Sequence, residues 1–229
     1  MFIASSTVGP WQANCHVLHA DRTTSAVVID PGIDAAPMVT NTLAEHGWTL
    51  AGVLATHGHV DHIADAAALA NRAGVPFWLH GGDAFMLARP SAGLGPESAP
   101  LLARLLGADE LPAPDQFIDL SGQDTIEVAG LRLGVVPAPG HTPGCVLYRA
   151  EDDDGLVVWT GDVLFAGSIG RTDLPGGDPA AMRDSLSRIL STLPDGARLL
   201  PGHGPTTTLG RERATNPYLQ PSFLEGSNL

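Results

Sequence analysis

The chain has 229 residues, and a hydrophobic content of 44% lets it bury a large core, so we expect one domain spanning residues 1–229. A formal net charge of −13 with only 12 Lys and Arg argues against nucleic acid as a partner, because phosphate binding needs clustered basic side chains. No apolar run approaches the roughly 20 residues that cross a bilayer. We expect neither a signal peptide nor a membrane partner.

The two cysteines, Cys15 and Cys145, are too few for a disulfide framework. Lone thiols fit a reducing compartment, and the sequence therefore predicts a cytoplasmic protein. Nothing in the sequence indicates the oligomeric state.

The first part of the chain alternates short apolar runs with turn signals. It predicts strands at residues 2–8, 15–20 and 26–29, a helix over 34–45 and a buried strand over 51–55. Turn residues between the first three strands favour an antiparallel opening.

Four potential metal ligands follow that buried strand within six residues: His57, His59, Asp61 and His62. Helix formers continue from Asp61 to a stop at Gly74, so the motif is predicted to be a strand-to-helix turn. We expect Gly58 to supply the backbone freedom that aims the histidines on either side of it. Single histidines in loops are usually only hydrogen-bonded, but three with an aspartate indicate metal binding.

The region after the next strand, predicted at residues 75–80, carries weaker signals. Helical stretches at 83–88 and 97–106 are linked by residues 89–96, which are rich in Gly and Pro. Such breakers predict a mobile surface connection. This connection either borders a substrate cleft or is an ordinary exposed loop.

The second half repeats the sequence of strands and then a helix. Strands are predicted at residues 125–128, 131–136, 145–149, 156–160 and 198–200, with a helix over 179–193. The acidic residues 151–155 read as a solvated hairpin turn. Strands followed by a helix, twice over, predict an α/β fold: an αββα sandwich of two sheets with helices on its outer faces.

Three further candidates, His141, Asp162 and His203, each follow an apolar run that ends in glycine or proline. Each alone has an ordinary reading as a turn, cap or hydrogen-bonded loop residue. We expect all three at the same sheet edge as residues 57–62. Together with His57, His59, Asp61 and His62 they make seven side chains, which are enough ligands for two metal ions.

These motifs closely resemble the metallo-β-lactamase superfamily and, within it, glyoxalase II-type hydroxyacylglutathione hydrolases of the short bacterial form. The resemblance covers nearly the whole chain. It is carried by residues 56–62, 139–144, 160–165, 170–173 and 201–204, with Glu212 and residues 216–219.

The resemblance implies two metal sites with a shared ligand. His57, His59 and His141 would hold one ion, Asp61, His62 and His203 the other, and Asp162 would bridge them. Mixed imidazole and carboxylate ligation suits two divalent ions, zinc first, with iron or manganese possible.

The activity that the resemblance implies is hydrolysis of a small acyl thioester such as hydroxyacylglutathione, through attack by a metal-bound hydroxide. Asp61 would orient the hydroxide and manage its proton, as the catalytic residue. Arg171 would grip an anionic part of the substrate, or else pair with nearby Asp173 for structure.

The chain also departs from the family pattern. Full-length glyoxalase II enzymes carry a C-terminal helical domain that binds glutathione, but only 26 residues follow His203 here. The thiol carrier therefore stays open. Lactonase and nuclease activity also occur on this scaffold, and the acidic charge disfavours the nuclease. We disfavour a β-lactamase because secreted resistance enzymes carry signal peptides.

Two other functions remain. The persulfide dioxygenase branch resembles this chain at residues 170–173 and uses one iron, held here by His57, His141 and Asp162. An aromatic residue typically follows that motif in the dioxygenases, whereas Leu174 follows it here and favours the hydrolase. The other is a non-catalytic, metal-stabilised binding module, which could lose Asp61 or Asp162 without penalty, yet the chain keeps both.

Overall fold

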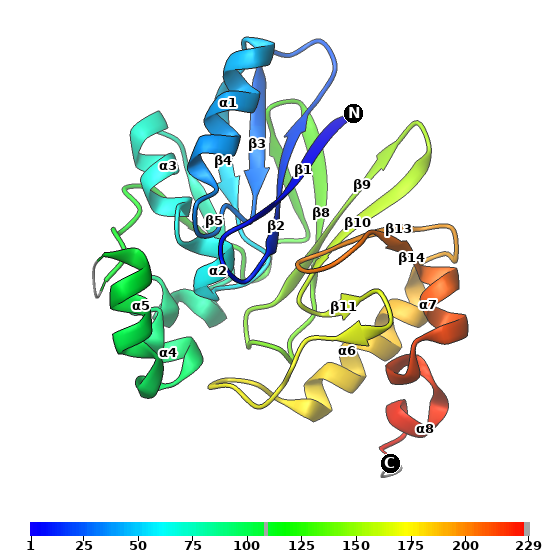
Figure 1. The fold of residues 1–229 in the computed structure, drawn as a ribbon. Helices are drawn as coiled ribbons and strands as arrows, with labels where there is room; N and C mark the ends of the chain where they lie inside the picture. The colour runs from blue at the N-terminus through cyan, green and yellow to red at the C-terminus, as the bar shows by residue number, and fades with distance from the viewer. Residues whose placement is uncertain (108–109, 227–229) are drawn as a thin grey trace.

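Two six-stranded sheets lie face to face, with helices on their outer sides (Figure 1). The computed structural model describes residues 1–107 and 110–226. The expected domain of residues 1–229 therefore includes five residues, 108–109 and 227–229, that lie outside the described part. The layer order confirms the predicted αββα sandwich. No helix among the described residues combines the length and apolar character that a membrane crossing requires.

The first sheet has its strands in chain order, β1-β2-β3-β4-β5-β6. The first three strands pair antiparallel, as predicted, and the later ones join in parallel. Apolar side chains on its outer face pack against α1 (Ala36–His46) and α3 (Ala66–Ala73). The strands are β1 (Phe2–Val8), β2 (Ala13–His19), β3 (Ser25–Ile29), β4 (Thr49–Leu54), β5 (Phe77–Leu79) and β6 (Phe117–Asp119).

The second sheet has the order β14-β13-β10-β9-β8-β7. Its pairs are antiparallel except β10 and β13, which run parallel. Helix α6 (Pro179–Thr192) covers its outer face. The strands are β7 (Thr125–Val128), β8 (Leu131–Pro137), β9 (Val146–Asp152), β10 (Gly155–Gly161), β13 (Arg198–Pro201) and β14 (Thr207–Thr208).

The main core fills the space between the two sheets. Leu54 of β4 meets Tyr148 and Trp159 of the second sheet there, and both aromatic side chains are almost completely buried. The Tyr148 hydroxyl donates to the Ala55 carbonyl at 2.9 Å, which ties the second sheet to the end of β4. This rigid support holds the strand ends that carry the predicted ligands.

The segment after the ligand motif differs from the single helix predicted from Asp61 to Gly74. It forms α2 (Val60–Ile63) and then α3, with a break at Asp65. The Asp65 carboxylate accepts a hydrogen bond from the backbone N–H of Ala36 at 2.7 Å, which draws the chain toward the start of α1. A tertiary contact, not helix propensity, sets this break.

Residues 89–96 are not the fully exposed, irregular connection that the breakers predicted. They contain α4 (Ser91–Leu94) and the start of the 3₁₀ helix η2 (Pro96–Ser98), and Gly93 is buried. On either side lie the 3₁₀ helix η1 (Gly81–Met86) and α5 (Ala99–Leu106). Glycine here permits close packing against the ligand motif.

Several short elements escaped prediction because each is too short to show a hydrophobic period. They are β6, β14, the small sheet of β11 (Leu164–Phe165) and β12 (Ser168–Ile169), and the C-terminal α7 (Leu209–Thr215), η3 (Pro217–Leu219) and α8 (Pro221–Leu224).

Candidate metal centre

The predicted ligands come together at one edge of the sandwich because the strands that precede them end there. His57 follows β4, His141 follows β8, Asp162 follows β10 and His203 follows β13. The parallel pairing of β10 with β13 brings the ends of these two strands side by side. The fold thus juxtaposes side chains that lie up to 146 positions apart in the sequence (203 − 57).

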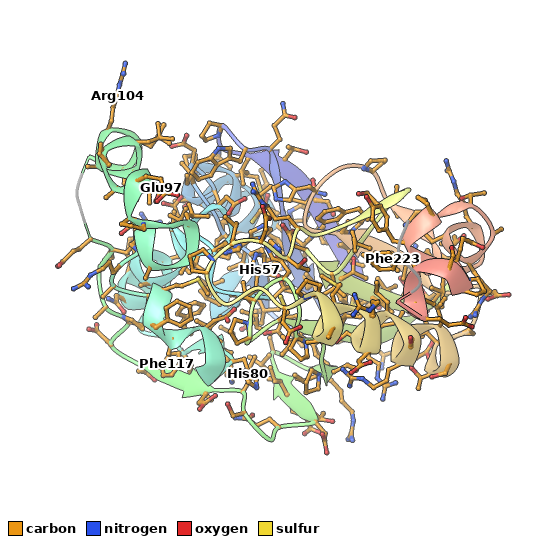
Figure 2. The ribbon with its side chains drawn as sticks, turned by 90° about the horizontal axis from the view of Figure 1, so that it is seen from below. His57, His80, Glu97, Arg104, Phe117 and Phe223 are labelled. Carbon is orange, nitrogen blue, oxygen red and sulfur yellow. The ribbon has the colours of Figure 1, made fainter. Side chains whose placement is uncertain are left out.

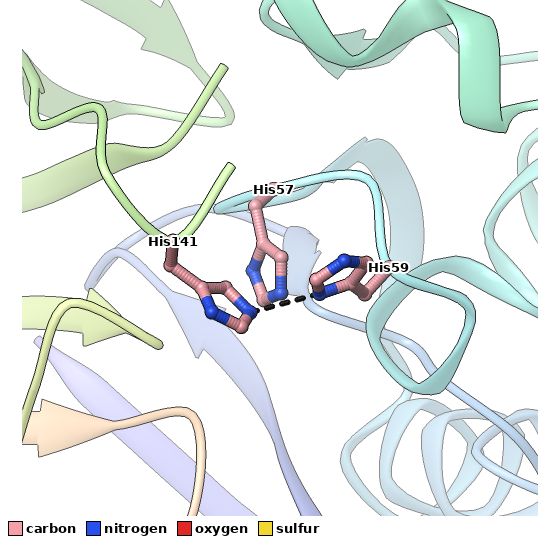
Figure 3. Close-up of side chains that lie close together, drawn as sticks. All are labelled: His57, His59 and His141. Atoms are coloured by element: carbon pink, nitrogen blue, oxygen red, sulfur yellow. Dashed lines mark hydrogen bonds between the residues drawn. The ribbon is translucent and has the colours of Figure 1, made fainter. Parts of the chain in front are cut away.

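The first ligand group consists of His57, His59 and His141, all buried (Figure 3). One nitrogen from each lies within 4.8 Å of the others, and Nδ1 of His59 is 2.8 Å from Nε2 of His141. Nε2 of His57 is buried without any hydrogen-bond partner in the described structure. Three imidazoles that point at one spot, with one nitrogen unpaired, leave a place for a cation.

The second group consists of Asp61, His62 and His203, whose ligand atoms also lie within 4.8 Å of one another. Nε2 of His203 is 3.2 Å from Oδ2 of Asp61 and 3.3 Å from Nε2 of His62. His62 is fully buried, whereas Asp61 and His203 keep 17% and 26% of their side chains exposed. This second group therefore faces the cleft.

Asp162 lies between the two groups. Its Oδ1 is 3.4 Å from Nε2 of His62, and its Oδ2 is 3.5 Å from Nε2 of both His141 and His203. Oδ1 is buried without a hydrogen-bond partner in the described structure. A carboxylate within reach of both groups can serve both.

The electrostatics divide the site into two halves. Burial lowers the pKa of His57, and the neighbouring His62 and His141 lower it further. Burial and His141 together lower the pKa of His59 to about 3. These two imidazoles stay neutral at pH 7 and keep the lone pairs that a metal needs.

In the second half of the site, carboxylates beside His62 and His203 favour the protonated form of these imidazoles. Burial acts to lower the pKa of His62, but Asp61 and Asp162 outweigh it and raise that pKa to about 10. Burial also acts to lower the pKa of His203, but Asp61 and Asp162 outweigh it and raise that pKa. In the absence of a metal, a proton on His62 offsets part of the carboxylate charge, and a bound cation would take over that role.

These residues fit a dinuclear metal centre. Seven imidazole and carboxylate donors are more than the four ligands of a closed structural zinc site, and no cysteine belongs to the cluster in the described structure. Two buried polar atoms without partners, on His57 and Asp162, mark positions that a bound cation would satisfy.

Two further buried aspartates that the sequence analysis did not single out hold the ligand loops in place. Asp30 accepts from the Thr56 backbone N–H and hydroxyl, both at 2.7 Å, and lies 3.1 Å from Nδ1 of His62. Asp83 accepts from the N–H groups of Gly58 and Gly144. Asp30 directly follows β3, so the strand-end rule that found the ligands also pointed to it.

Asp83 also follows a strand, β5, by four residues, but it lies in the 3₁₀ helix η1, and the sequence indicated only a helical stretch at residues 83–88. Burial raises the pKa of its carboxyl group, while the hydrogen bonds from Thr142, Gly58 and Gly144 oppose that rise. The same hydrogen bonds explain why residues so far apart approach one another.

Glycine has a different role at residue 58 from the one predicted. Gly58 does not adopt a left-handed conformation; instead it has no room for a side chain. A Cβ there would lie 2.8 Å from Cβ of Asp83 and 2.8 Å from Cε of Met86. Close packing around the ligands, not backbone freedom, requires this glycine.

The ligand cluster opens into a cleft of about 260 Å³. Arg171 is one of its walls, and the guanidinium group also forms hydrogen bonds of 2.6 and 2.8 Å with Asp173. The predicted pairing of Arg171 with Asp173 is thus present, and the substrate contact of Arg171 stays a prediction. The lining residues are Trp11, His59, Asp61, Leu94, His141, Asp162, Arg171, Leu174 and His203.

The fold and site define a metallo-hydrolase, and comparison with known proteins agrees. The family model described as "Metallo-beta-lactamase superfamily" matches residues 8–203. The chain belongs to this superfamily.

Two curated relatives match almost end to end. An uncharacterised protein of Mycobacterium tuberculosis (strain H37Rv) is 39% identical over 96% of this chain and 98% of its own length. The protein named hydroxyacylglutathione hydrolase GloC of Haemophilus influenzae is 34% identical over 93% of this chain and 95% of its own. The name of the second relative agrees with the glyoxalase II-type resemblance of the sequence.

Three solved structures show the same fold. The B3 metallo-β-lactamase BLEG-1 has a TM-score of 0.81 and 34% identity, over 96% of this chain and 100% of that one. The protein TTHA1623, in a di-iron-bound form, has a TM-score of 0.75 and 37% identity, over 94% and 100%. ETHE1 from Myxococcus xanthus has a TM-score of 0.74 and 26% identity, over 100% and 92%.

Proposed function

We propose that this protein is a metal-dependent hydrolase of the glyoxalase II type, which cleaves a small acyl thioester such as hydroxyacylglutathione. The observation that carries the proposal is the position of Asp162 within 3.5 Å of ligands from both groups, at the floor of an open cleft. Similarity to the GloC protein of Haemophilus influenzae supports the thioester.

In this proposal His57, His59 and His141 hold one divalent ion, Asp61, His62 and His203 hold the other, and Asp162 serves both. When bound, such a pair lowers the pKa of water to about 7 and polarises a carbonyl oxygen. The protein residues fix the ligand directions: Nδ1 of His141 donates to the Arg171 carbonyl at 2.7 Å, and Nδ1 of His203 to the Gln12 carbonyl at 3.2 Å.

Asp61 is the proposed catalytic residue. Burial acts to raise its pKa, but His62 and His203 hold it below its usual value, so the carboxylate is ionised at pH 7. Part of its side chain is exposed and lines the cleft. An ionised carboxylate at that place can accept a hydrogen bond from an attacking water and orient it toward a substrate carbonyl.

Arg171 is the proposed contact for an anionic part of the substrate, since its guanidinium stands at the cleft rim. Zinc is the proposed metal, with iron or manganese as alternatives; the di-iron form of TTHA1623 keeps iron in consideration. The free, buried Cys15 and Cys145 fit a cytoplasmic place of action.

The test is metal analysis of the purified protein combined with turnover of S-lactoylglutathione, glutathione persulfide and a β-lactam. We expect two metal ions per chain, hydrolysis of the thioester, and loss of turnover after chelation with recovery on adding zinc. The persulfide dioxygenase alternative from the sequence, and the similarity to the B3 metallo-β-lactamase BLEG-1, make the other two substrates the necessary comparison.

Three results would refute the proposal. One iron per chain with oxygen consumed on glutathione persulfide would indicate a persulfide dioxygenase. Preferred cleavage of the β-lactam would indicate a lactamase. Metal-dependent stability without turnover of any acyl thioester would indicate a binding module.

A further inference from the structure

A second cavity, of about 290 Å³, adjoins the cleft, and Arg171 lines both. Its walls come from the loop after β12, the first turns of α6 and the C-terminal segment of η3 and α8, which packs against α6. The lining residues are Ile169, Gly170, Arg171, Thr172, Pro179, Met182, Arg183, Tyr218 and Phe223.

Apart from Arg171, which pairs with Asp173, the polar side chains that line this cavity are hydrogen-bond donors without an assigned task. Arg183 is half-buried, yet within residues 1–107 and 110–226 its guanidinium forms no hydrogen bond or ion pair. The hydroxyl groups of Thr172 and Tyr218 likewise have no partner in that part of the chain. Their donor atoms are not fully buried, so water solvates them, and an acceptor on a ligand can replace that water.

The charge of the cavity contrasts with that of the protein. The chain has 25 Asp and Glu and a net charge of −13, but two arginines and no acidic residue line this cavity. Arg171 is already paired with Asp173, so Arg183 and the hydroxyl donors are the groups of this cavity that suit an anion.

The remaining walls are apolar. The rings of Tyr218 and Phe223 meet edge to face with centroids 5.1 Å apart, and Met182 and Pro179 complete the surface. Such walls suit the short aliphatic and amide chain that carries a carboxylate, and they exclude a strongly hydrated inorganic ion.

We propose that this cavity binds the carboxylate-bearing end of the substrate's thiol carrier, with Arg183 and the Tyr218 hydroxyl as the groups that bind the carboxylate. The inference rests on the proposed thioester hydrolysis and adds the substrate class: thioesters of an acidic, peptide-like thiol. Arg171 lies between the two cavities, so one elongated substrate spans from the metal ligands to Arg183. The short C-terminal segment thereby contributes Tyr218 and Phe223 to a binding site for the thiol carrier.

Kinetics on the metal-loaded protein test this with two substrates that share an acyl group. S-lactoylglutathione has an acidic carrier, and S-lactoyl-N-acetylcysteamine a neutral one. For Arg183→Gln we expect KM for the acidic substrate to rise on the order of tenfold, because a charge-assisted hydrogen bond is lost, with kcat within about twofold. KM for the neutral substrate should stay unchanged, and Arg183→Lys should recover part of the loss.

Arg104→Gln is the matched control, because it removes the same charge from an exposed position. Figure 2 shows Arg104 projecting from the side of the molecule opposite to Phe223. An equal KM change in this control, or no difference between the acidic and neutral substrates in Arg183→Gln, would overturn the carrier site.

A binding measurement separates this inference from the proposed function. Calorimetry with S-methylglutathione, which cannot be hydrolysed, should show about tenfold weaker binding to Arg183→Gln than to the parent protein. Such weakening in a protein that hydrolyses no thioester would sustain the anionic site and refute the hydrolase. Equal binding by both proteins would refute the site, whatever the activity.

Discussion

The Asp83 carboxylate and the Thr142 hydroxyl, 59 positions apart, form a buried hydrogen bond of 2.6 Å. The same carboxylate accepts from the backbone N–H of Gly58 at 2.8 Å and of Gly144 at 2.7 Å. Gly58 lies between two predicted ligands, and Gly144 closes the loop that begins with His141. One side chain therefore fixes the distance between the loops that supply all three imidazoles of the first ligand group.

Replacing Asp83 by Asn should weaken metal binding. An amide keeps the shape but turns one acceptor oxygen into a donor, which then faces N–H or O–H groups that need an acceptor. We expect zinc affinity, measured by competition with a chromogenic chelator, to fall about 10- to 100-fold, as for other groups that orient metal ligands. Asp184→Asn, at an exposed position, is the control. Unchanged zinc affinity in Asp83→Asn would show that the loops hold their spacing without this carboxylate.

Replacing His203 by Ala should remove one metal ion and leave the other. His203 contributes only to the second ligand group, whereas the first keeps His57, His59 and His141 intact. We expect the metal content, measured by inductively coupled plasma mass spectrometry after desalting, to fall from two ions per chain toward one. His80→Ala, a histidine outside the ligand groups, should keep both ions. Loss of both ions from His203→Ala would mean that the two sites fill only together.

The sequence predicted the layers and the ligand cluster because both depend on local patterns. Apolar runs of strand length alternate with amphipathic helices, and a polar residue after each run marks the ends of β4, β10 and β13. Parallel pairing brings the ends of β10 and β13 side by side, and the packing of the two sheets places them beside the end of β4. Prediction of the seven side chains needed no knowledge of the loops between them.

The remaining features depend on contacts between distant residues, which no local pattern encodes. Asp83 supports the site from a 3₁₀ helix, and Gly93 reaches it from a run of breakers, where its carbonyl lies 3.2 Å from Nε2 of His59. The cavity at Arg183 needs α8 to pack on α6, and α8 has too few residues to show a period. Long-range packing decides each of these positions.

Replacing Gly202 by Ala should damage the site more than the fold. A Cβ at this position would overlap the Asp162 carboxylate and lie 2.8 Å from Cε1 of His62. Because the Gly202 backbone bonds to Gly161 and Asn14, the chain cannot move aside and Asp162 must turn away. We expect at least a tenfold loss of zinc affinity. Gly196→Ala, where a Cβ meets nothing within 4 Å, is the matched control. A Gly202→Ala protein with normal zinc affinity would place Asp162 outside the metal centre.

His16 should make the stability of the metal-free protein fall with acidification. It is buried in β2, where Nδ1 lies 2.7 Å from the Ser5 hydroxyl. Burial lowers the pKa of its imidazole from 6.5 to about 4, although Asp30 acts to raise it. The unfolded chain thus binds this proton more readily than the folded one. Its contribution to stability is complete above pH 6.5 and is lost as the pH falls toward 4.

Urea unfolding at pH 7 and pH 5, with chelator present at both, measures this effect. His16→Asn keeps a polar atom near Ser5 but cannot take up the proton. The decrease in unfolding free energy between the two pH values should therefore be smaller in the variant than in the parent protein, by on the order of 2 kcal/mol. His46→Asn, which removes an exposed imidazole, controls for the loss of a histidine as such. Parallel pH dependence in His16→Asn and the parent would show that His16 takes up its proton equally in the folded and unfolded chains.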